Sequence, residues 1–180
     1  KDLGKVAWAQ EAINALAAKG IIKGVDGSNF APAKNVTRAE FVTMLVRSLS
    51  LTDTGASNTF KDVKQGVWYS DSIAAAVKAG IVKGSGSGKF EPGREISREE
   101  MAIMIVNALK GQLQPVDKNA ALQKFADKSK IAPYAQEAVA QLTELGIVNG
   151  VDAGKFAPKG IANRAQAAVI IFRMLEKKVS

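Results

Sequence analysis

The stretch Gly20-Ile21-Ile22-Lys23-Gly24 decides the fold, because it occurs three times in the chain. It returns as Gly80-Ile81-Val82-Lys83-Gly84 and as Gly146-Ile147-Val148-Asn149-Gly150, displaced first by 60 residues (20 to 80) and then by 66 (80 to 146). Self-similarity at a nearly fixed displacement is typical of proteins built from structural repeats. The sequence therefore predicts three related units.

Three other landmarks repeat in the same order in every unit. An aromatic residue precedes the Gly-Ile stretch, and a Phe-x-Pro triplet and an Arg follow it. This agreement places the units at residues 1–50, 58–110 and 123–178, with linkers at about 51–57 and 111–122. The landmarks are Trp8, Trp68 and Tyr134; Phe30-Ala31-Pro32, Phe90-Glu91-Pro92 and Phe156-Ala157-Pro158; and Arg38, Arg98 and Arg164.

Each unit is expected to form two helices. The first helix should run from the aromatic residue to just before a Gly, since apolar residues such as Ile13 and Leu16 recur at helical spacing. Gly20, Gly80 and Gly146 stand where a left-handed residue ends a helix. The loop of constant length that follows then leads to a Phe, which should anchor it.

The second helix of each unit opens with a capping box, in which an N-cap side chain and a Glu or Gln three residues later bond each other's backbone N–H groups. The residues that follow are apolar on nearly every face, which is typical of buried helices. We therefore predict an all-α body in which three helix-loop-helix repeats pack their second helices together with approximate threefold symmetry. The boxes are Thr37-Arg38-Ala39-Glu40, Ser97-Arg98-Glu99-Glu100 and Asn163-Arg164-Ala165-Gln166.

Composition excludes several kinds of chemistry. The 180 residues include no Cys and no His, so disulfides, zinc fingers, Ser-His-Asp triads and imidazole-bound metals are ruled out. No pair of carboxylates stands out as a catalytic acid and base, and no apolar run is long enough to cross a membrane. We expect no enzyme activity, no metal, no cofactor and no membrane insertion.

The Arg at the first position of each second helix has two readings. A cation there is mildly unfavourable, because helix N-termini carry partial positive charge. One reading is an ion pair with the box carboxylate or a neighbouring Asp. The other is a site for a carboxylate or phosphate, formed by the guanidinium together with free helix N–H groups.

The aromatic residues and the loop glycines also have two readings each. Trp8, Trp68 and Tyr134 are either core anchors or platforms for a sugar, because a large aromatic buries much area but keeps a polar group. The glycines that end the repeated stretch either adopt a positive φ in a turn or also allow a ligand to approach the backbone closely. These glycines are Gly24, Gly84 and Gly150.

Three units with an aromatic start, Gly-Ile-Ile/Val-x-Gly, Phe-x-Pro and Thr-Arg-Ala-Glu resemble a trio of S-layer homology domains, over essentially the whole chain. The resemblance implies a three-pronged spindle of helices. It also implies that the chain anchors an exported protein of a Gram-positive bacterium to the cell wall, by binding pyruvylated secondary cell wall polysaccharide. Arg38, Arg98 and Arg164 are then the residues expected to bind the ketal-pyruvate carboxylate.

The third unit departs from the motif and loses nearby charges. Its box ends in Gln166, Lys23 and Lys83 are replaced by Asn149, and Lys34 and Arg94 are replaced by Gly160. We therefore group these neutral residues with Arg164 and expect unequal sites, with any pocket that relies on unit three the weakest.

The main rival is nucleic-acid binding. The net charge is +8, but the cations are spread along the chain and no helix presents one basic face. Lys1-Asp2 aligns with Lys61-Asp62, so we expect the chain to begin one residue inside its first unit, as a monomeric fragment of a larger surface protein. The cations favour an anionic partner. The resemblance implies that this partner is a wall polymer, at the cell surface and outside the cell.

Overall fold

A computed structural model describes residues 2–51, 60–84 and 86–178. Within these ranges the chain contains helices and no strand, only isolated bridges between single residues, so the prediction of an all-α repeat protein is confirmed. The helices are α1 (Ala7–Ala18), α2 (Arg38–Ser48), α3 (Ser70–Lys78), α4 (Arg98–Ala108), α5 (Lys118–Leu122), α6 (Pro133–Glu144) and α7 (Arg164–Lys178), with 3-10 turns η1 (Lys128–Lys130) and η2 (Asp152–Gly154).

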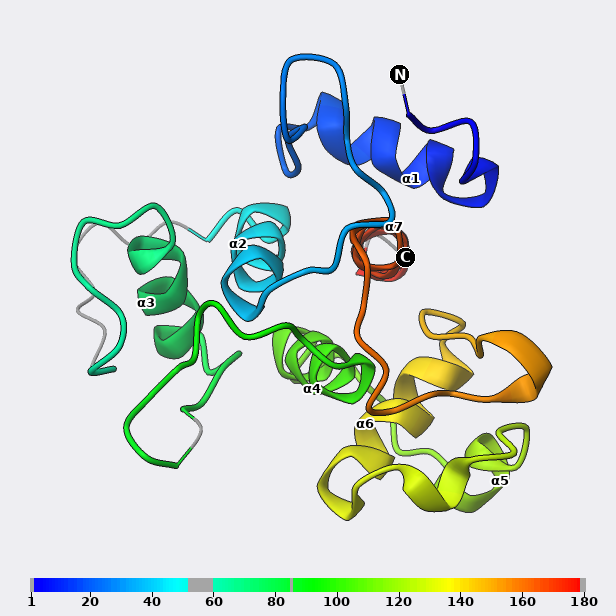
Figure 1. The fold of residues 1–180 in the computed structure, drawn as a ribbon. Coiled ribbons are helices and arrows are strands. Elements are labelled where there is room, and N and C mark those ends of the chain that lie inside the picture. The colour runs from blue at the N-terminus through cyan, green and yellow to red at the C-terminus, as the bar shows by residue number, and fades with distance from the viewer. Residues whose placement is uncertain (1, 52–59, 85, 179–180) are drawn as a thin grey trace.

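The three second helices, α2, α4 and α7, are seen nearly end-on in the middle of Figure 1, and the first helices lie outside them. Backbone hydrogen bonds join the segments that lead into them. The N–H of Val36 donates to Ala162 (3.0 Å), that of Ala162 to Ile96 (3.1 Å), and that of Ile96 to Val36 (2.9 Å). The spindle as a whole stays a prediction, but these bonds have the cyclic order that threefold packing requires.

Each first helix packs on the second helix of a different unit. Helix α3 contacts α2, α6 contacts α4, and α1 contacts α7. Every such pair therefore joins two units, and the pair α1–α7 connects the first unit to the third. The predicted linker 111–122 includes α5, which packs on α6. Residues 52–57 of the other linker lie outside the described residues.

The predicted helix ends are confirmed. Gly20, Gly80 and Gly146 have φ of +69°, +71° and +69°. Each of the following Ile residues donates its N–H back to the last turn, as Ile21 does to Leu16 (2.9 Å). All three capping boxes form, including the one in which Asn163 accepts from the N–H of Gln166 (2.9 Å).

A single Asp in each unit holds the Phe-x-Pro loop, a role that the repeat pattern alone does not reveal. Asp62 accepts hydrogen bonds from the N–H groups of Phe90 and Glu91, both at 2.8 Å, and Asp2 and Asp127 make the equivalent pairs of bonds. Burial opposes the charge of Asp62, but these two N–H groups outweigh it and lower its pKa. The clamp fixes the direction in which the Phe carbonyl points.

The middle residue of the triplet adopts a left-handed conformation in all three units, at Ala31, Glu91 and Ala157 (φ 56°, 60° and 54°). A side chain in this region costs about 1–2 kcal/mol, whereas Gly enters it freely. Ala also leaves the unfolded chain fewer conformations than Gly does. This stabilises the folded state by about 0.4–1 kcal/mol and offsets part of the cost.

We expect Ala157→Gly to raise the free energy of unfolding by about 0.5 kcal/mol, because it relieves the left-handed strain. Urea unfolding followed by circular dichroism measures the change. The matched control is Ala17→Gly in α1, where the helical residue is exposed and the same substitution should cost about 0.5–1 kcal/mol. Equal losses in the two variants would show that no strain is stored in the triplet.

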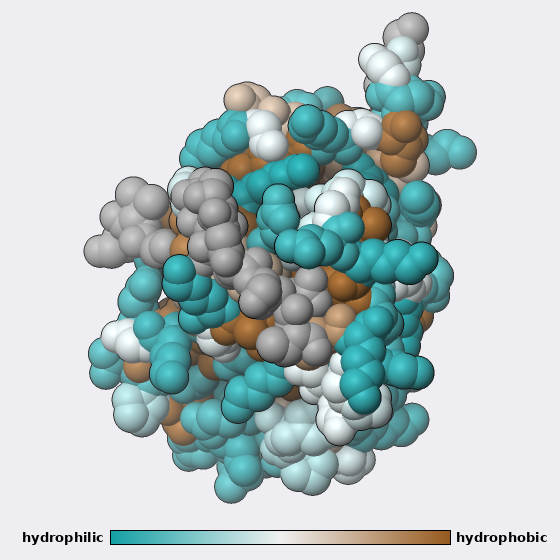
Figure 2. All heavy atoms as spheres, turned by 90° about the vertical axis from the view of Figure 1, so that its left-hand side faces the viewer, coloured by the Kyte–Doolittle hydropathy of each residue, from teal (hydrophilic) through white to brown (hydrophobic). Residues whose placement is uncertain are grey.

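The surface over α3 is mostly hydrophilic, with apolar residues in small groups (Figure 2). The apolar side chains of α3, such as Ile73 and Ala76, are instead buried. This outer helix thus packs against α2 with its apolar stripe and turns its polar face to solvent.

Candidate functional site

The repeat arginines lie at the first position of α2, α4 and α7 and connect neighbouring units. They are only 5%, 7% and 7% exposed. The Nε of each donates to the carbonyl of a Phe in another unit: Arg38 to Phe90 (2.9 Å), Arg98 to Phe156 (2.8 Å) and Arg164 to Phe30 (2.8 Å). Each guanidinium also lies over the ring of that Phe, within 4.4–5.1 Å of its centroid.

The second bond of the guanidinium differs between units. Arg98 donates from Nη2 to the carbonyl of Asn149 (2.9 Å), and Arg164 donates to that of Lys23 (2.7 Å). Arg38 instead pairs with the Glu100 carboxylate (2.9 Å), which belongs to the box of the next unit. In the described part of the chain, neither Arg98 nor Arg164 has a carboxylate at ion-pair distance, and Arg38 pairs with the box carboxylate of the second unit rather than with Glu40 of its own box.

Burial lowers the pKa of all three arginines, and a nearby carboxylate opposes that shift in each case: Glu100 at Arg38, Asp127 at Arg98, and Glu40 with Asp2 at Arg164. The ordinary pKa of a guanidinium is about 12 or higher, so all three stay charged at neutral pH. Arg98 and Arg164 therefore place a positive charge in a desolvated position with neutral carbonyl partners.

The expectation of free N–H groups at these helix starts is wrong. The N–H of Arg38 donates to Arg94 (2.8 Å), that of Arg98 to Gly160 (3.0 Å) and that of Arg164 to Lys34 (2.9 Å), all backbone carbonyls of another unit. The next N–H in each helix is bonded to a Pro carbonyl in the same way. Any anion at these positions must therefore be held by side chains.

Three similar pockets surround the arginines, with volumes of about 400, 320 and 170 Å³. Each takes its Arg from one unit, its glycine loop and helix from a second, and its aromatic residue from the third. The Arg98 pocket includes Arg98, Asn149, Gly150, Gln166, Arg173 and Trp8; the Arg38 pocket, Arg38, Lys83, Gly84, Arg94, Glu100 and Tyr134; and the Arg164 pocket, Arg164, Lys23, Gly24, Glu40, Arg47 and Trp68.

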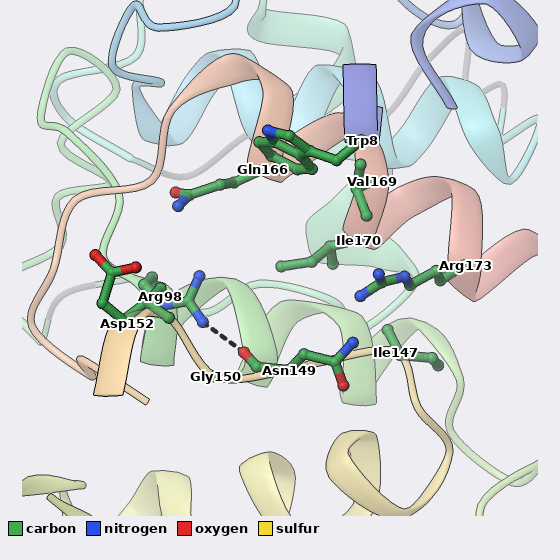
Figure 3. A pocket seen from close by; sticks show the side chains of 11 residues that line it. Trp8, Arg98, Ile147, Asn149, Gly150, Asp152, Gln166, Val169, Ile170 and Arg173 are labelled. Carbon is green, nitrogen blue, oxygen red and sulfur yellow. Dashed lines mark hydrogen bonds between the residues drawn. The ribbon is translucent and has the colours of Figure 1, made fainter. Parts of the chain in front are cut away.

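The aromatic residues lie at the surface, so their reading as core anchors is wrong. Trp8, Trp68 and Tyr134 are 60%, 62% and 70% exposed. Figure 3 shows Trp8 beside Gln166 and Val169 in the Arg98 pocket, on the side opposite Asn149. Each pocket therefore has an aromatic surface that a sugar ring could cover.

The loop glycines are explained by close packing, and their reading as positive-φ turn residues is wrong. None of Gly24, Gly84 and Gly150 has a positive φ. A Cβ on Gly24 would lie 2.7 Å from the carbonyl oxygen of Asn29, and one on Gly84 would lie 2.6 Å from the Phe60 ring. These glycines let the loop close on itself, and they also line the pockets.

The grouping of the neutral residues with Arg164 is also wrong. Asn149 and Gly160 both lie at Arg98, since their carbonyls accept from its side chain and its backbone N–H. Lys23 belongs to the Arg164 pocket, and Lys83 and Arg94 belong to the Arg38 pocket. Lys34 lies 3.8 Å from Glu40 and does not line the Arg164 pocket.

Two further cations were missed by sequence reasoning. Arg47 and Arg173 stand nine residues after Arg38 and Arg164, and each lines a pocket. The equivalent residue of the second unit is Asn107 in the Arg38 pocket. Aligning the second helices beyond the capping box would have revealed this position.

Comparison with known families agrees with the repeat. The family model of the S-layer homology domain matches residues 1–42, 59–102 and 124–168. The chain belongs to this family. S-layer homology domains occur in S-layer and surface proteins of Gram-positive bacteria, which confirms the predicted cell-surface localisation and supports cell-wall anchoring.

Relatives of this S-layer homology chain include both enzymes and S-layer proteins. It is 42% identical to an amylopullulanase of Thermoanaerobacterium thermosulfurigenes and 40% identical to exoglucanase XynX of Acetivibrio thermocellus, over 94% of the chain in each case but only 9% and 16% of those proteins. It is 39% identical to S-layer protein sap of Bacillus anthracis, over 91% of the chain and 20% of that protein. The chain thus spans a fifth or less of the length of these relatives.

Two further findings concern the described residues of the S-layer homology chain. None of their helices combines the length and the apolar character needed to cross a bilayer. Three or more carboxylates do not come together among them as a metal site would require.

Proposed function

We propose that this chain holds an exported protein on the cell wall by binding pyruvylated secondary cell wall polysaccharide, with Arg38, Arg98 and Arg164 as the residues that bind the ketal-pyruvate carboxylate. The observation that supports this most is the burial of Arg98 and Arg164 without a bonded carboxylate. Both are buried cations whose partners among the described residues are neutral carbonyls.

The physical reason is charge compensation. A buried charge is costly unless an opposite charge meets it, and a charge-assisted hydrogen bond contributes about 1.5–3 kcal/mol. Nε and one Nη nitrogen of Arg98 are bonded to carbonyls, which leaves donors of the guanidinium for a ligand. In Figure 3 one of its nitrogens points away from Asn149, towards Gln166. A carboxylate in the pocket would accept hydrogen bonds from the remaining N–H groups of this guanidinium.

The rest of the pocket suits a sugar. Trp8 provides an exposed aromatic face, and Val169 and Ile170 provide an aliphatic wall for methyl groups. A ketal pyruvate adds one fixed carboxylate and one methyl group to an otherwise neutral ring. Arg173 would add attraction for the acid at a second point of the pocket.

The proposed role is binding without catalysis. S-layer proteins and glycoside hydrolases share this segment, so we assign the hydrolytic activities of such relatives to their other parts. Nucleic-acid binding is the weaker candidate. The cations at the arginine sites are distributed over three separate pockets, whereas a duplex or single strand requires a continuous basic surface.

Pull-down on isolated cell walls tests the proposal. We expect the chain to sediment with walls that carry pyruvylated polysaccharide and to stay in solution after the pyruvate is chemically removed, since the guanidiniums lose their anionic partner. Binding should also weaken as salt rises, because the net charge of +8 attracts an acidic polymer at long range. Equal sedimentation with both wall preparations would contradict the proposal.

A further inference from the structure

We propose that Glu100 occupies the anion position of the Arg38 pocket, so that this pocket binds an acidic sugar more weakly than the Arg98 and Arg164 pockets do. Glu100 is thus a specificity-determining residue that makes three similar pockets unequal. The inference rests on the proposed function, since it concerns the same carboxylate ligand. It reverses the ranking expected from the sequence, in which pockets relying on unit three were the weakest.

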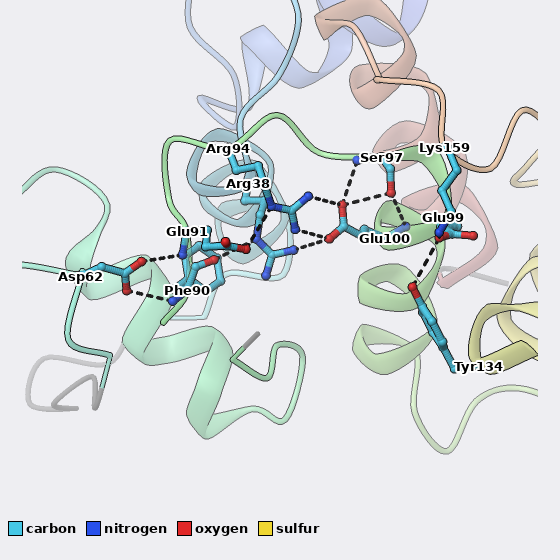
Figure 4. A network of polar contacts seen from close by, with 10 residues as sticks. All are labelled: Arg38, Asp62, Phe90, Glu91, Arg94, Ser97, Glu99, Glu100, Tyr134 and Lys159. Atoms are coloured by element: carbon cyan, nitrogen blue, oxygen red, sulfur yellow. Dashed lines mark hydrogen bonds and ion pairs between the residues drawn. The ribbon is translucent and has the colours of Figure 1, made fainter. Parts of the chain in front are cut away.

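The contacts of Glu100 carry the argument (Figure 4). Its Oε1 accepts from Arg38 (2.9 Å) and from Nη2 of Arg94, while its Oε2 accepts from Nη1 of Arg94 (3.2 Å). Oε2 also accepts from the backbone N–H and the hydroxyl of Ser97, both at 3.0 Å. One internal carboxylate therefore meets both guanidiniums of this pocket, as the acid group of a ligand would.

The equivalent residues of the other two pockets make no such contact. Glu40 accepts from the N–H of Thr37 (2.8 Å) and lies 3.8 Å from Lys34, but it has no bond to Arg164. Gln166 is neutral and accepts from the N–H of Asn163 (3.2 Å). In the described residues, carboxylates act on Arg164 and Arg98 only from a distance, and none is bonded to either guanidinium as Glu100 is to Arg38.

A count of charges alone would give another order. Lys83, Arg38 and Arg94 against Glu100 leave the Arg38 pocket at +2, the same as the Arg164 pocket with Lys23, Arg47 and Arg164 against Glu40. Arg98 and Arg173 against Asp152 leave the Arg98 pocket at +1, the lowest of the three. The direct contacts of Glu100 matter more than the net charge of the pocket. A ligand carboxylate in the Arg38 pocket must share both guanidiniums with Glu100 and lie beside a like charge.

One position of the second helices also distinguishes the Arg38 pocket from the other two. Arg47 and Arg173 line the Arg164 and Arg98 pockets, but Asn107 takes this position in the Arg38 pocket. Its side-chain amide donates to the carbonyl of Ile81 (3.0 Å). The Arg38 pocket therefore differs from the other two pockets in two ways. A carboxylate is bonded to its Arg, and its second helix provides no cation at this position.

Removing the charge of Glu100 should leave the fold intact. Glu100 is the third residue of a capping box, and Gln166 closes the same box in the third unit. Glu100→Gln therefore copies an arrangement that the chain already contains. Arg38 keeps its bond to Phe90 in this variant, and the Gln oxygen can accept from it in place of the carboxylate.

The chain provides a separate reporter for each pocket. It has two Trp and two Tyr residues. Trp8 lines the Arg98 pocket, Trp68 the Arg164 pocket and Tyr134 the Arg38 pocket. Labelling with 5-fluorotryptophan and 3-fluorotyrosine allows ¹⁹F NMR to follow the three pockets in one titration. The second tyrosine, Tyr69, has its ring centroid 5.0 Å from that of Trp68, so its signal should follow that of the Arg164 pocket.

The probe is a synthetic amino sugar with a ketal pyruvate, and its methyl ester is the neutral control. We expect Trp8 and Trp68 to reach half-saturation at a concentration of acid at least about tenfold lower than Tyr134 does, a difference of about 1.4 kcal/mol. Glu100→Gln should bring the Tyr134 midpoint down by about tenfold and leave the other two midpoints unchanged. The matched control Glu40→Gln should lower the Trp68 midpoint by less than about threefold, because Glu40 acts on Arg164 from a distance and is not bonded to it.

Equal midpoints for the three reporters in the unmodified chain would overturn the inference, and this result needs no variant. An unchanged Tyr134 midpoint in a folded Glu100→Gln variant would also overturn it. Failure of the proposed function has a different signature. In that case the acid and its methyl ester would give the same midpoints at Trp8 and Trp68, whatever Tyr134 does.

Discussion

Residues 58–110, produced alone, are expected to be unfolded, although the sequence repeat marks them as one unit. Helix α3 packs on α2 of the first unit, and α4 packs on α6 of the third. The backbone of Ile96 bonds to Val36 on one side and to Ala162 on the other. An isolated unit loses all these partners, and two short helices bury too little apolar surface to offset the entropy of folding.

Far-UV circular dichroism with a urea titration measures this directly. The whole chain should show a helical spectrum and a cooperative transition, and the single unit should show neither. A cooperative transition in the isolated unit, with helicity like that of the whole chain, would show that each unit is folded by contacts within itself. The contacts between units would then be secondary.

Arg98→Ala is expected to lower the free energy of unfolding by about 2–4 kcal/mol, because it leaves the buried Phe156 carbonyl and the partly buried Asn149 carbonyl without this donor. Arg98 donates to Phe156 and to Asn149, and its guanidinium lies over the Phe156 ring. The same substitution should abolish acid binding in the pocket that Trp8 reports. Urea unfolding gives the stability, and the Trp8 signal gives the binding.

The control for stability is Arg47→Ala. Arg47 also lines a pocket but is exposed, so its removal should change stability by no more than about 0.5 kcal/mol. A loss for Arg98→Ala as small as that for Arg47→Ala would mean that Arg98 does not hold neighbouring units together. It would also show that a buried guanidinium is not needed for the fold.

Local features were predictable because their causes lie within a few residues. A Gly after an apolar stripe predicts a left-handed helix end, and Thr37 with Glu40 predicts a capping box. Both were confirmed at every occurrence. The Asp clamp depends on a contact between residues about 28 positions apart, such as Asp62 and Phe90, and no local rule points to it.

Contacts between units were not predictable, because each apolar stripe fits any of the second helices. The expectation that Asn149 and Gly160 lie with Arg164 assumed that residues of one unit stay together. The chain instead pairs the Arg of one unit with the loop of another, so both residues lie at Arg98. The exposed aromatics were misread for a related reason. The size of Trp8 predicts burial, but its position at a groove between units leaves it in solvent.

We propose that buried guanidiniums bind an acid group on a wall polysaccharide. Titration calorimetry with the ketal-pyruvylated amino sugar and with its methyl ester tests it most directly, since the two probes differ in charge and hardly in shape. We predict that the acid binds at least about tenfold more tightly than the ester, a difference of about 1.4 kcal/mol. Equal affinity for the two probes would show that the guanidiniums do not recognise the acid group.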